Sequence, residues 1–114
     1  MTVASRHNLI SEMDFAATVD EMAIAFGWKI YGVLEQMVYA RRLSKGFPDR
    51  IMVRRGRLLF IEYKSQTGRV MPDQTEWLEE LGKCRAPEGY RVRGGVEVYL
   101  WRPSDLDAIE EVLK

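Results

Sequence analysis

The feature that most constrains the fold is a pair of short apolar runs, at about 49–54 and 57–64, separated by Arg55-Gly56. Two such runs joined by two residues predict a β-hairpin, although Asn or Asp is more usual than Arg before the glycine of a tight turn. Because successive strand side chains point to opposite faces, both faces of this hairpin are apolar. A sheet of that kind needs helices on both sides. The apolar residues are Ile51, Val53, Leu58 and Phe60 on one face, and Met52, Leu59, Ile61 and Tyr63 on the other.

The sequence around the hairpin supplies the other layers and predicts an α/β fold, a central mixed sheet flanked by helices on both faces. Capping residues, apolar periodicity and helix-ending glycine set the boundaries. The length suits one domain, 1–114, with residues 1–10 as a flexible arm. The expected elements are a helix capped by Ser11 and ended by Gly27, a strand at 28–34, the hairpin, a helix from Pro72 to about Lys83, a strand at 96–101, and a helix from Asp105 to Leu113 capped by Ser104.

Composition excludes several classes of protein. Cys84 is the only cysteine and His7 the only histidine, so neither an internal disulfide nor a zinc-ligand set is available. No apolar run approaches the roughly 20 residues that span a bilayer, and the N-terminus lacks a signal-peptide core. We therefore expect a cytoplasmic protein without membrane partners.

The distribution of charge is uneven on a chain whose net charge is zero. Residues 41–69 hold nine basic and two acidic side chains, a local charge of +7. Such a patch is compatible with binding the phosphates of a nucleic acid. A solvated face on which charges of one sign cluster is the equally acceptable alternative.

The hairpin also carries charged residues near its open end. A two-residue turn at Arg55-Gly56 would place Asp49 opposite Glu62, and Lys64 would project from the same face as Glu62. Two adjacent carboxylates repel each other unless a cation lies between them, and oxygen ligands suit Mg²⁺ or Mn²⁺. Lys64 could then orient a metal-bound water or stabilise developing negative charge. The alternative is a solvated strand end with a weak surface ion pair.

Two polar residues lie on helix faces that otherwise pack inward. Glu12 is on the same stripe as Phe15 in the first helix, and Gln74 is on the same stripe as Trp77 in the second. Polar groups on packing faces need partners. We expect Glu12 and Gln74 to join the acids of the hairpin, although a favourable first-turn position for Glu12 and a fringe position for Gln74 are open alternatives.

Several segments, in this order, resemble the VRR-NUC domain, a branch of the PD-(D/E)xK nuclease superfamily. They are "SEMDF" (11–15), "GFPD" (46–49), "IEYK" (61–64), "DQTEWL" (73–78) and "GVEVYLWRPSD" (95–105). The likeness runs from about Ser11 to the end of the chain. It implies a restriction-endonuclease-like core and metal-dependent cleavage of DNA phosphodiesters.

The resemblance also implies a role for each matching residue. Asp49 and Glu62 would ligate the metal, with the backbone carbonyl of Tyr63 as a further ligand. Glu12 would bind the metal directly or through water. Lys64 would act on the water nucleophile, and Gln74 would lie at the edge of the site.

Standalone domains of the family, mostly viral, are similar to Holliday-junction resolvases and act as homodimers. Larger relatives cut flaps. We therefore expect a Mg²⁺- or Mn²⁺-dependent endonuclease, dimeric and acting on branched DNA such as Holliday junctions, in the host cytoplasm if the protein is viral. A flap or general DNA nuclease, or a nucleic-acid-binding module without catalysis, is the alternative.

Basic residues that flank the proposed site in sequence are candidate phosphate contacts. Arg54, Arg55 and Arg57 are instead expected to lie at a solvated hairpin tip. The candidate phosphate contacts are Arg41, Arg42, Lys45, Arg50 and Arg69.

Overall fold

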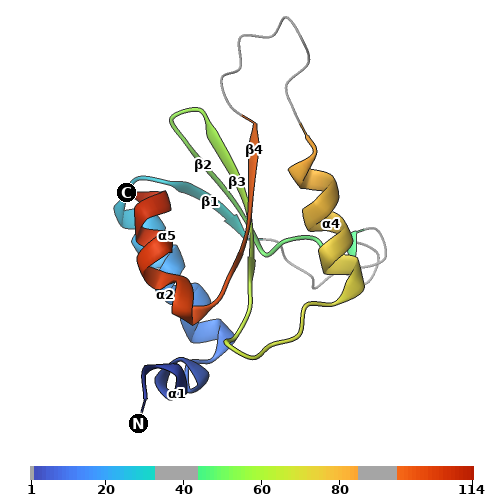
Figure 1. The fold of residues 1–114 in the computed structure, drawn as a ribbon. Coiled ribbons are helices and arrows are strands. Elements are labelled where there is room, and N and C mark those ends of the chain that lie inside the picture. The colour runs from blue at the N-terminus through green and yellow to red at the C-terminus, as the bar shows by residue number, and fades with distance from the viewer. Residues whose placement is uncertain (1, 33–43, 85–94) are drawn as a thin grey trace, which may run out of the picture.

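The computed structural model describes residues 2–32, 44–84 and 95–114. A four-stranded sheet lies in the middle, with α2 and α5 on one face and α4 on the other, which confirms the predicted α/β class (Figure 1). The expected strand at 96–101 and the helix from Pro72 are present, whereas residues 33 and 34 of the expected first strand lie outside the described ranges. The elements are α1 Val3–Asn8, α2 Glu12–Ala25, β1 Lys29–Gly32, β2 Arg50–Arg54, β3 Arg57–Tyr63, α4 Pro72–Gly82, β4 Val96–Trp101, the 3-10 helix η1 Pro103–Asp105, and α5 Leu106–Leu113.

The strands run in the order β1-β2-β3-β4, antiparallel except that β3 and β4 are parallel. The predicted hairpin register is confirmed within the strands, where Val53 pairs with Leu58. Arg55 and Gly56 have φ angles of 47° and 79°, the left-handed conformations that a primed turn requires. The ladder nevertheless ends one pair early, at Arg50 and Ile61. Asp49 directly precedes β2, so it forms no ladder pair with Glu62, although the same register places the two residues opposite each other and their carboxylates interact.

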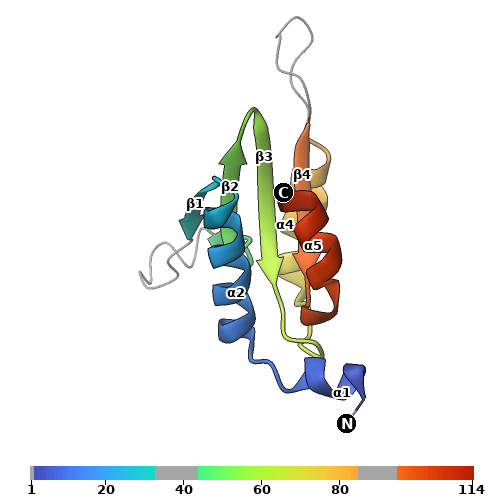
Figure 2. The same ribbon diagram turned by 90° about the vertical axis from the view of Figure 1, so that its left-hand side faces the viewer.

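The main core lies between the sheet and the layer of α2 and α5, which Figure 2 shows side by side in front of the strands. The face of the hairpin that carries Met52 and Ile61 is fully buried there. Phe15 and Val19 come from the predicted stripe of α2 and fill the same layer. Burial of these side chains supplies the main driving force for holding α2 against β3.

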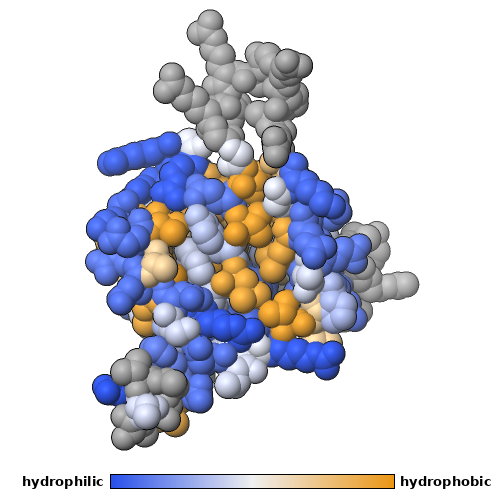
Figure 3. All heavy atoms as spheres, viewed as in Figure 1, coloured by the Kyte–Doolittle hydropathy of each residue, from blue (hydrophilic) through white to orange (hydrophobic). Residues whose placement is uncertain are grey.

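The opposite face of the sheet is less completely covered. No residue of α4 is fully buried, and on β4 only Trp101 is. Val53, on the same face of the hairpin as Phe60, is 43% exposed. Hydrophobic side chains accordingly gather in the middle of the molecular face that carries β4 (Figure 3).

The hairpin tip differs from expectation, because two of its arginines are held by the protein. Arg57 binds Glu97 through Nε and Nη2 at 2.8 and 2.7 Å, and Arg54 donates to the carbonyl of Phe26 at 2.8 Å. Both guanidinium groups lie over the ring of Trp28, 4.8 Å away for Arg54 and 5.1 Å for Arg57. The prediction of a solvated tip is wrong for these two residues, because backbone carbonyls, a carboxylate and the ring of Trp28 contact their guanidinium groups.

Two local features differ from those described from the sequence. The segment expected to be a flexible arm contains a helix, since α1 occupies Val3–Asn8 and lies against η1. Ser104 does not cap the last helix: its hydroxyl accepts a hydrogen bond from Gln66, while the carboxylate of Asp105 accepts from the backbone N–H of Arg102. No helix in the described ranges is long and apolar enough to cross a membrane.

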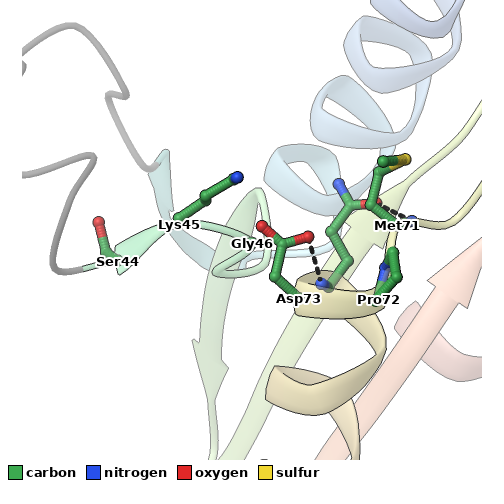
Figure 4. A pocket seen from close by; sticks show the side chains of 7 residues that line it. Ser44, Lys45, Gly46, Met71, Pro72 and Asp73 are labelled. Atoms are coloured by element: carbon green, nitrogen blue, oxygen red, sulfur yellow. Dashed lines mark hydrogen bonds between the residues drawn. The ribbon is translucent and has the colours of Figure 1, made fainter.

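The loop before β2 packs directly on the first turn of α4 (Figure 4). The carbonyl of Lys45 accepts a hydrogen bond from Trp77 Nε1 at 3.0 Å, and the Phe47 ring packs edge-on against Trp77. Gly46 has a φ of +85°, and a Cβ atom there would lie 2.6 Å from the carbonyl carbon of Asp73. Only glycine fits this backbone approach, which brings Asp49 and α4 to the same end of the sheet.

We predict that Gly46→Ala destabilises the protein by about 2–4 kcal/mol, because the added methyl group is strained by both its φ angle and the contact with Asp73. Gly82→Ala is the matched control. No atom lies within 4 Å of a Cβ at that position, and the substitution in a helix favours folding by up to about 1 kcal/mol. Urea denaturation of the three proteins measures both changes. Equal stability of Gly46→Ala and wild type would contradict the close approach.

Candidate active site

Asp49 is fixed by two hydrogen bonds, one to its carboxylate and one to its backbone carbonyl. It follows Pro48, which is fully buried, and precedes the first residue of β2. Its carboxylate Oδ2 accepts a hydrogen bond from the backbone N–H of Tyr63 at 2.8 Å. Its own carbonyl accepts from Arg50 Nη1 at 3.0 Å. The carboxylate is thus held against the end of β3 although the β2–β3 ladder does not extend to Asp49.

Glu62 is the most constrained ionisable group of the site, with only 3% of the residue exposed. Its Oε1 accepts a hydrogen bond from Gln74 Nε2 at 3.0 Å and lies 3.8 Å from Lys64 Nζ. Its Oε2 is buried without a hydrogen-bond partner among the described residues. Burial, followed by the charge of Asp49, raises the pKa of Glu62 to about 8. A side-chain hydrogen bond with Asp49, available to the protonated form, acts in the same direction, and the charge of Lys64 acts in the opposite one.

Lys64 completes the cluster at the end of β3. Its backbone N–H donates to the carbonyl of Trp101 at 3.0 Å, which continues the pairing with β4 past the last ladder residue. Its side chain is 11% exposed. The ammonium and the Glu62 carboxylate therefore point to the same side, as their two-residue spacing predicts.

Gln74 serves two elements at once. Its Oε1 accepts the backbone N–H of Met71 at 2.9 Å, so it caps α4 where Met71 has no side-chain oxygen to do so. Its Nε2 donates to Glu62, as described above. The inward orientation expected from the sequence is present, and it fixes one oxygen of Glu62.

Glu12 lies at the rim of the site. It is the first residue of α2, is exposed, and contributes to a cavity of about 330 Å³ that Asp20, Asp49, Arg50 and Tyr63 also line. Its charge has a small effect on Glu62, raising the pKa in the same direction as Asp49. The structure therefore brings Glu12 near the acids but leaves it in contact with solvent.

The donor set fits a divalent cation that keeps part of its water shell. Within the described ranges, no three or more acidic, histidine or cysteine side chains are gathered closely enough to enclose a metal ion. Asp49 and Glu62 supply two carboxylates, and Mg²⁺ commonly binds through one or two with water completing its octahedron. The buried Oε2 of Glu62, which has no hydrogen-bond partner among the described residues, is an oxygen donor that such an ion could use.

The candidate phosphate contacts differ in where the structure places them: two are exposed, two lie outside the described residues, and one is bound to another side chain. Lys45 and Arg69 are exposed, and Lys45 lines a cavity of about 560 Å³ beside the first turn of α4. Arg41 and Arg42 lie outside the described residues. Arg50 is held by Asp20, a residue that sequence reasoning missed. The four-residue spacing of Glu12, Ala16 and Asp20 places Asp20 on the helix face of Glu12 and was the available signal.

A mixed sheet with helices on both faces, carrying Asp, Glu and Lys side chains at the end of its central hairpin, defines the restriction-endonuclease-like class. Comparison with family models agrees: the model described as the VRR-NUC domain matches residues 9–98. The chain therefore belongs to the VRR-NUC domain family and carries a nuclease domain whose substrate is DNA. Comparisons with curated proteins and with solved structures gave no match.

The raised pKa of Glu62 predicts a pH-dependent stability in the metal-free protein. Because the folded state keeps this proton up to about pH 8 and the unfolded state loses it near 4.5, the free energy of unfolding falls as pH rises between these values. Glu62→Gln keeps the hydrogen-bonding shape without the ionisation, so its decline should be smaller, by on the order of 2 kcal/mol. Chemical denaturation in EDTA at several pH values measures this difference. Parallel curves for the two proteins would contradict the raised pKa.

Proposed function

We propose that this protein is a Mg²⁺- or Mn²⁺-dependent DNA endonuclease that hydrolyses phosphodiester bonds, with branched DNA such as Holliday junctions as its preferred substrate. The observation that supports it best is the buried Glu62 carboxylate, which interacts with the Asp49 carboxylate and whose Oε2 accepts no hydrogen bond from the described residues. A buried acid with an unused oxygen beside a second acid is costly in a purely structural position. It is well suited to a cation.

Each side chain of the cluster then has a distinct task. Asp49 and Glu62 would hold the ion, with the backbone carbonyl of Tyr63 and, through water, Glu12 as further ligands. A bound divalent ion polarises a phosphoryl oxygen and lowers the pKa of a coordinated water. Lys64, 3.8 Å from Glu62, would orient the attacking water and stabilise the charge that develops on the phosphate. Gln74 would keep Oε1 occupied, so that Oε2 faces the ion.

The DNA backbone would approach the site along basic residues of the loops around it. Lys45 and Arg69 are exposed, as a phosphate contact requires, and Lys45 lies on the loop that leads to Asp49. Arg41 and Arg42 precede this loop in sequence. Contacts of this kind position the duplex without reading its bases. This local excess of basic residues would attract DNA although the net charge of the chain is zero.

The preference for branched DNA and the homodimer rest on the family resemblance. Resolution of a four-way junction needs two coordinated cuts, and a dimer supplies two sites. A flap nuclease or a general DNA nuclease would use the same side chains on other substrates. A binding module without catalysis would have no use for the unpartnered Oε2. A cytoplasmic location stays a prediction.

We predict that Asp49→Ala and Lys64→Ala each reduce metal-dependent DNA cleavage by at least about 100-fold, since each removes a group that acts at the reacting phosphate. Glu111→Gln, which alters an exposed surface pair with Lys114, is the control and should cleave like wild type. Initial rates with Mg²⁺ or Mn²⁺, beside thermal unfolding to verify folding, give the comparison. Metal-dependent cleavage by both alanine variants at the wild-type rate would remove the mechanism.

The substrate is tested with matched four-way junctions, flaps and linear duplexes, with and without Mg²⁺. We expect junctions to be cut at least about 10-fold faster than the linear duplex, and sedimentation at high protein concentration to show a dimer. Preferential cutting of flaps would assign the flap alternative, and equal cutting of all substrates a general nuclease. Tight binding of DNA with no cleavage in either metal would instead support the binding module.

A further inference from the structure

A partly buried ion pair, Arg50 with Asp20, lies beside Asp49. Arg50 Nε lies 3.2 and 3.1 Å from the two carboxylate oxygens of Asp20, and Nη2 lies 3.0 Å from Oδ2. The side chains are 24% and 23% exposed, so solvent screens the pair only in part. It ties the middle of α2 to the first residue of β2.

The same guanidinium extends the contact to Asp49. Arg50 Nη1 donates to the Asp49 carbonyl at 3.0 Å. Tyr63 closes the circuit, since its hydroxyl donates to Asp20 Oδ1 at 2.9 Å and its backbone N–H donates to Asp49 Oδ2 at 2.8 Å. Asp20, Arg50, Asp49 and Tyr63 thus form a closed ring of hydrogen bonds, which we call the Asp20–Arg50 ring.

This ring holds Asp49 where its pairing with β3 has ended. The β2–β3 ladder stops at Arg50, so no pairing with β3 fixes the backbone of Asp49. Residues that hold metal ligands in place change metal affinity or activity by about 10–100-fold when removed. The ring also connects the helix that carries Glu12 to the segment around Asp49 and the first residue of β2.

We propose that Arg50 and Asp20 are positioning residues that fix the Asp49 carboxylate for metal binding, and that Arg50 does not contact DNA phosphates. This inference rests on the proposed function. It gives Arg50 a different task from the phosphate contact predicted from its place in the basic segment.

The geometry disfavours a phosphate contact for Arg50. A phosphate would have to displace Asp20 from two guanidinium nitrogens or share them with it, whereas the pair as it stands is electrically neutral. Lysine could not replace the arginine, because one ammonium cannot reproduce a planar fork that binds a carboxylate and a carbonyl together. The prediction is therefore that Lys fails at this position although its charge is the same.

The chain contains a matched control at the other end of the hairpin. Arg57 binds Glu97 through Nε and Nη2, donates through Nη1 to the carbonyl of Val112 at 2.8 Å, and Tyr99 donates to the same Glu97. The side chains of this pair are 35% and 29% exposed, close to the exposure of the first pair. Glu97→Gln therefore removes an ion pair of the same construction from a place without metal ligands.

The experiment measures Mn²⁺ binding calorimetrically in wild type, Asp20→Asn, Arg50→Lys, Glu97→Gln and Asp49→Ala, with thermal unfolding to verify that each is folded. DNA binding in EDTA and the steady-state kcat and KM for DNA are measured on the same proteins. We expect Asp20→Asn and Arg50→Lys to weaken Mn²⁺ binding and lower kcat by about 10-fold or more, with DNA affinity and KM unchanged. Glu97→Gln should bind Mn²⁺ like wild type.

Three results would overturn the inference. Wild-type Mn²⁺ affinity in Asp20→Asn and Arg50→Lys would show that the ring does not position Asp49. Stronger DNA binding in Asp20→Asn, with Mn²⁺ affinity unchanged, would return Arg50 to the phosphate contacts. An equal loss of Mn²⁺ affinity in Glu97→Gln would mean that any weakened ion pair has this effect. If wild type binds Mn²⁺ no better than Asp49→Ala, the proposed function itself fails, which is a separate outcome.

Discussion

The structure is organised around the burial of one carboxylate. Glu62 lies on one of the two inner strands of the sheet, almost wholly removed from water, and among the described residues only its Oε1 has a hydrogen-bond partner. Burying an ionised acid is costly unless charge or hydrogen bonds compensate. The surrounding elements supply part of that compensation: α4 contributes the amide of Gln74, and β3 itself contributes the ammonium of Lys64. The rest of the compensation would come from a cation on the side of Asp49, where the proposed chemistry requires one.

The sequence predicts the fold well where hydrophobic periodicity is strong. The hairpin is apolar on both faces, so it needed two helical layers, and the paired apolar positions determined its register. The turn formed despite Arg55, because one residue in the left-handed region is tolerated when the strands on either side are fixed by burial. The end of the ladder could not be predicted, because the contact of Arg50 with Asp20 depends on α2, which is distant from β2 in sequence.

The candidate site shows the same division. The spacing of Glu62 and Lys64 placed them on one face, and the inward position of Gln74 on its helix stripe indicated a polar partner. Asp20 was missed because its four-residue spacing from Ala16 and Glu12 indicates only a shared helix face, and its partner Arg50 lies on a strand distant in sequence. Arg54 and Arg57 were assigned to solvent for the same reason: the carbonyls, the carboxylate and the tryptophan that bind them come from other parts of the chain.

The two arginine–carboxylate clusters, one at each end of the hairpin, together fix the register of β2 against β3. Arg50 and Arg57 sit on opposite strands, and each is bound to a different neighbouring element, α2 in one case and β4 in the other. A sliding of β2 against β3 would have to break at least one of them in addition to exchanging the buried and exposed faces. The alignment of Asp49 with Glu62 is therefore stabilised by an ion pair at each end of the hairpin. Laboratory insertions at the Arg55-Gly56 tip should be absorbed as a larger loop, leaving the spacing of the two acids intact.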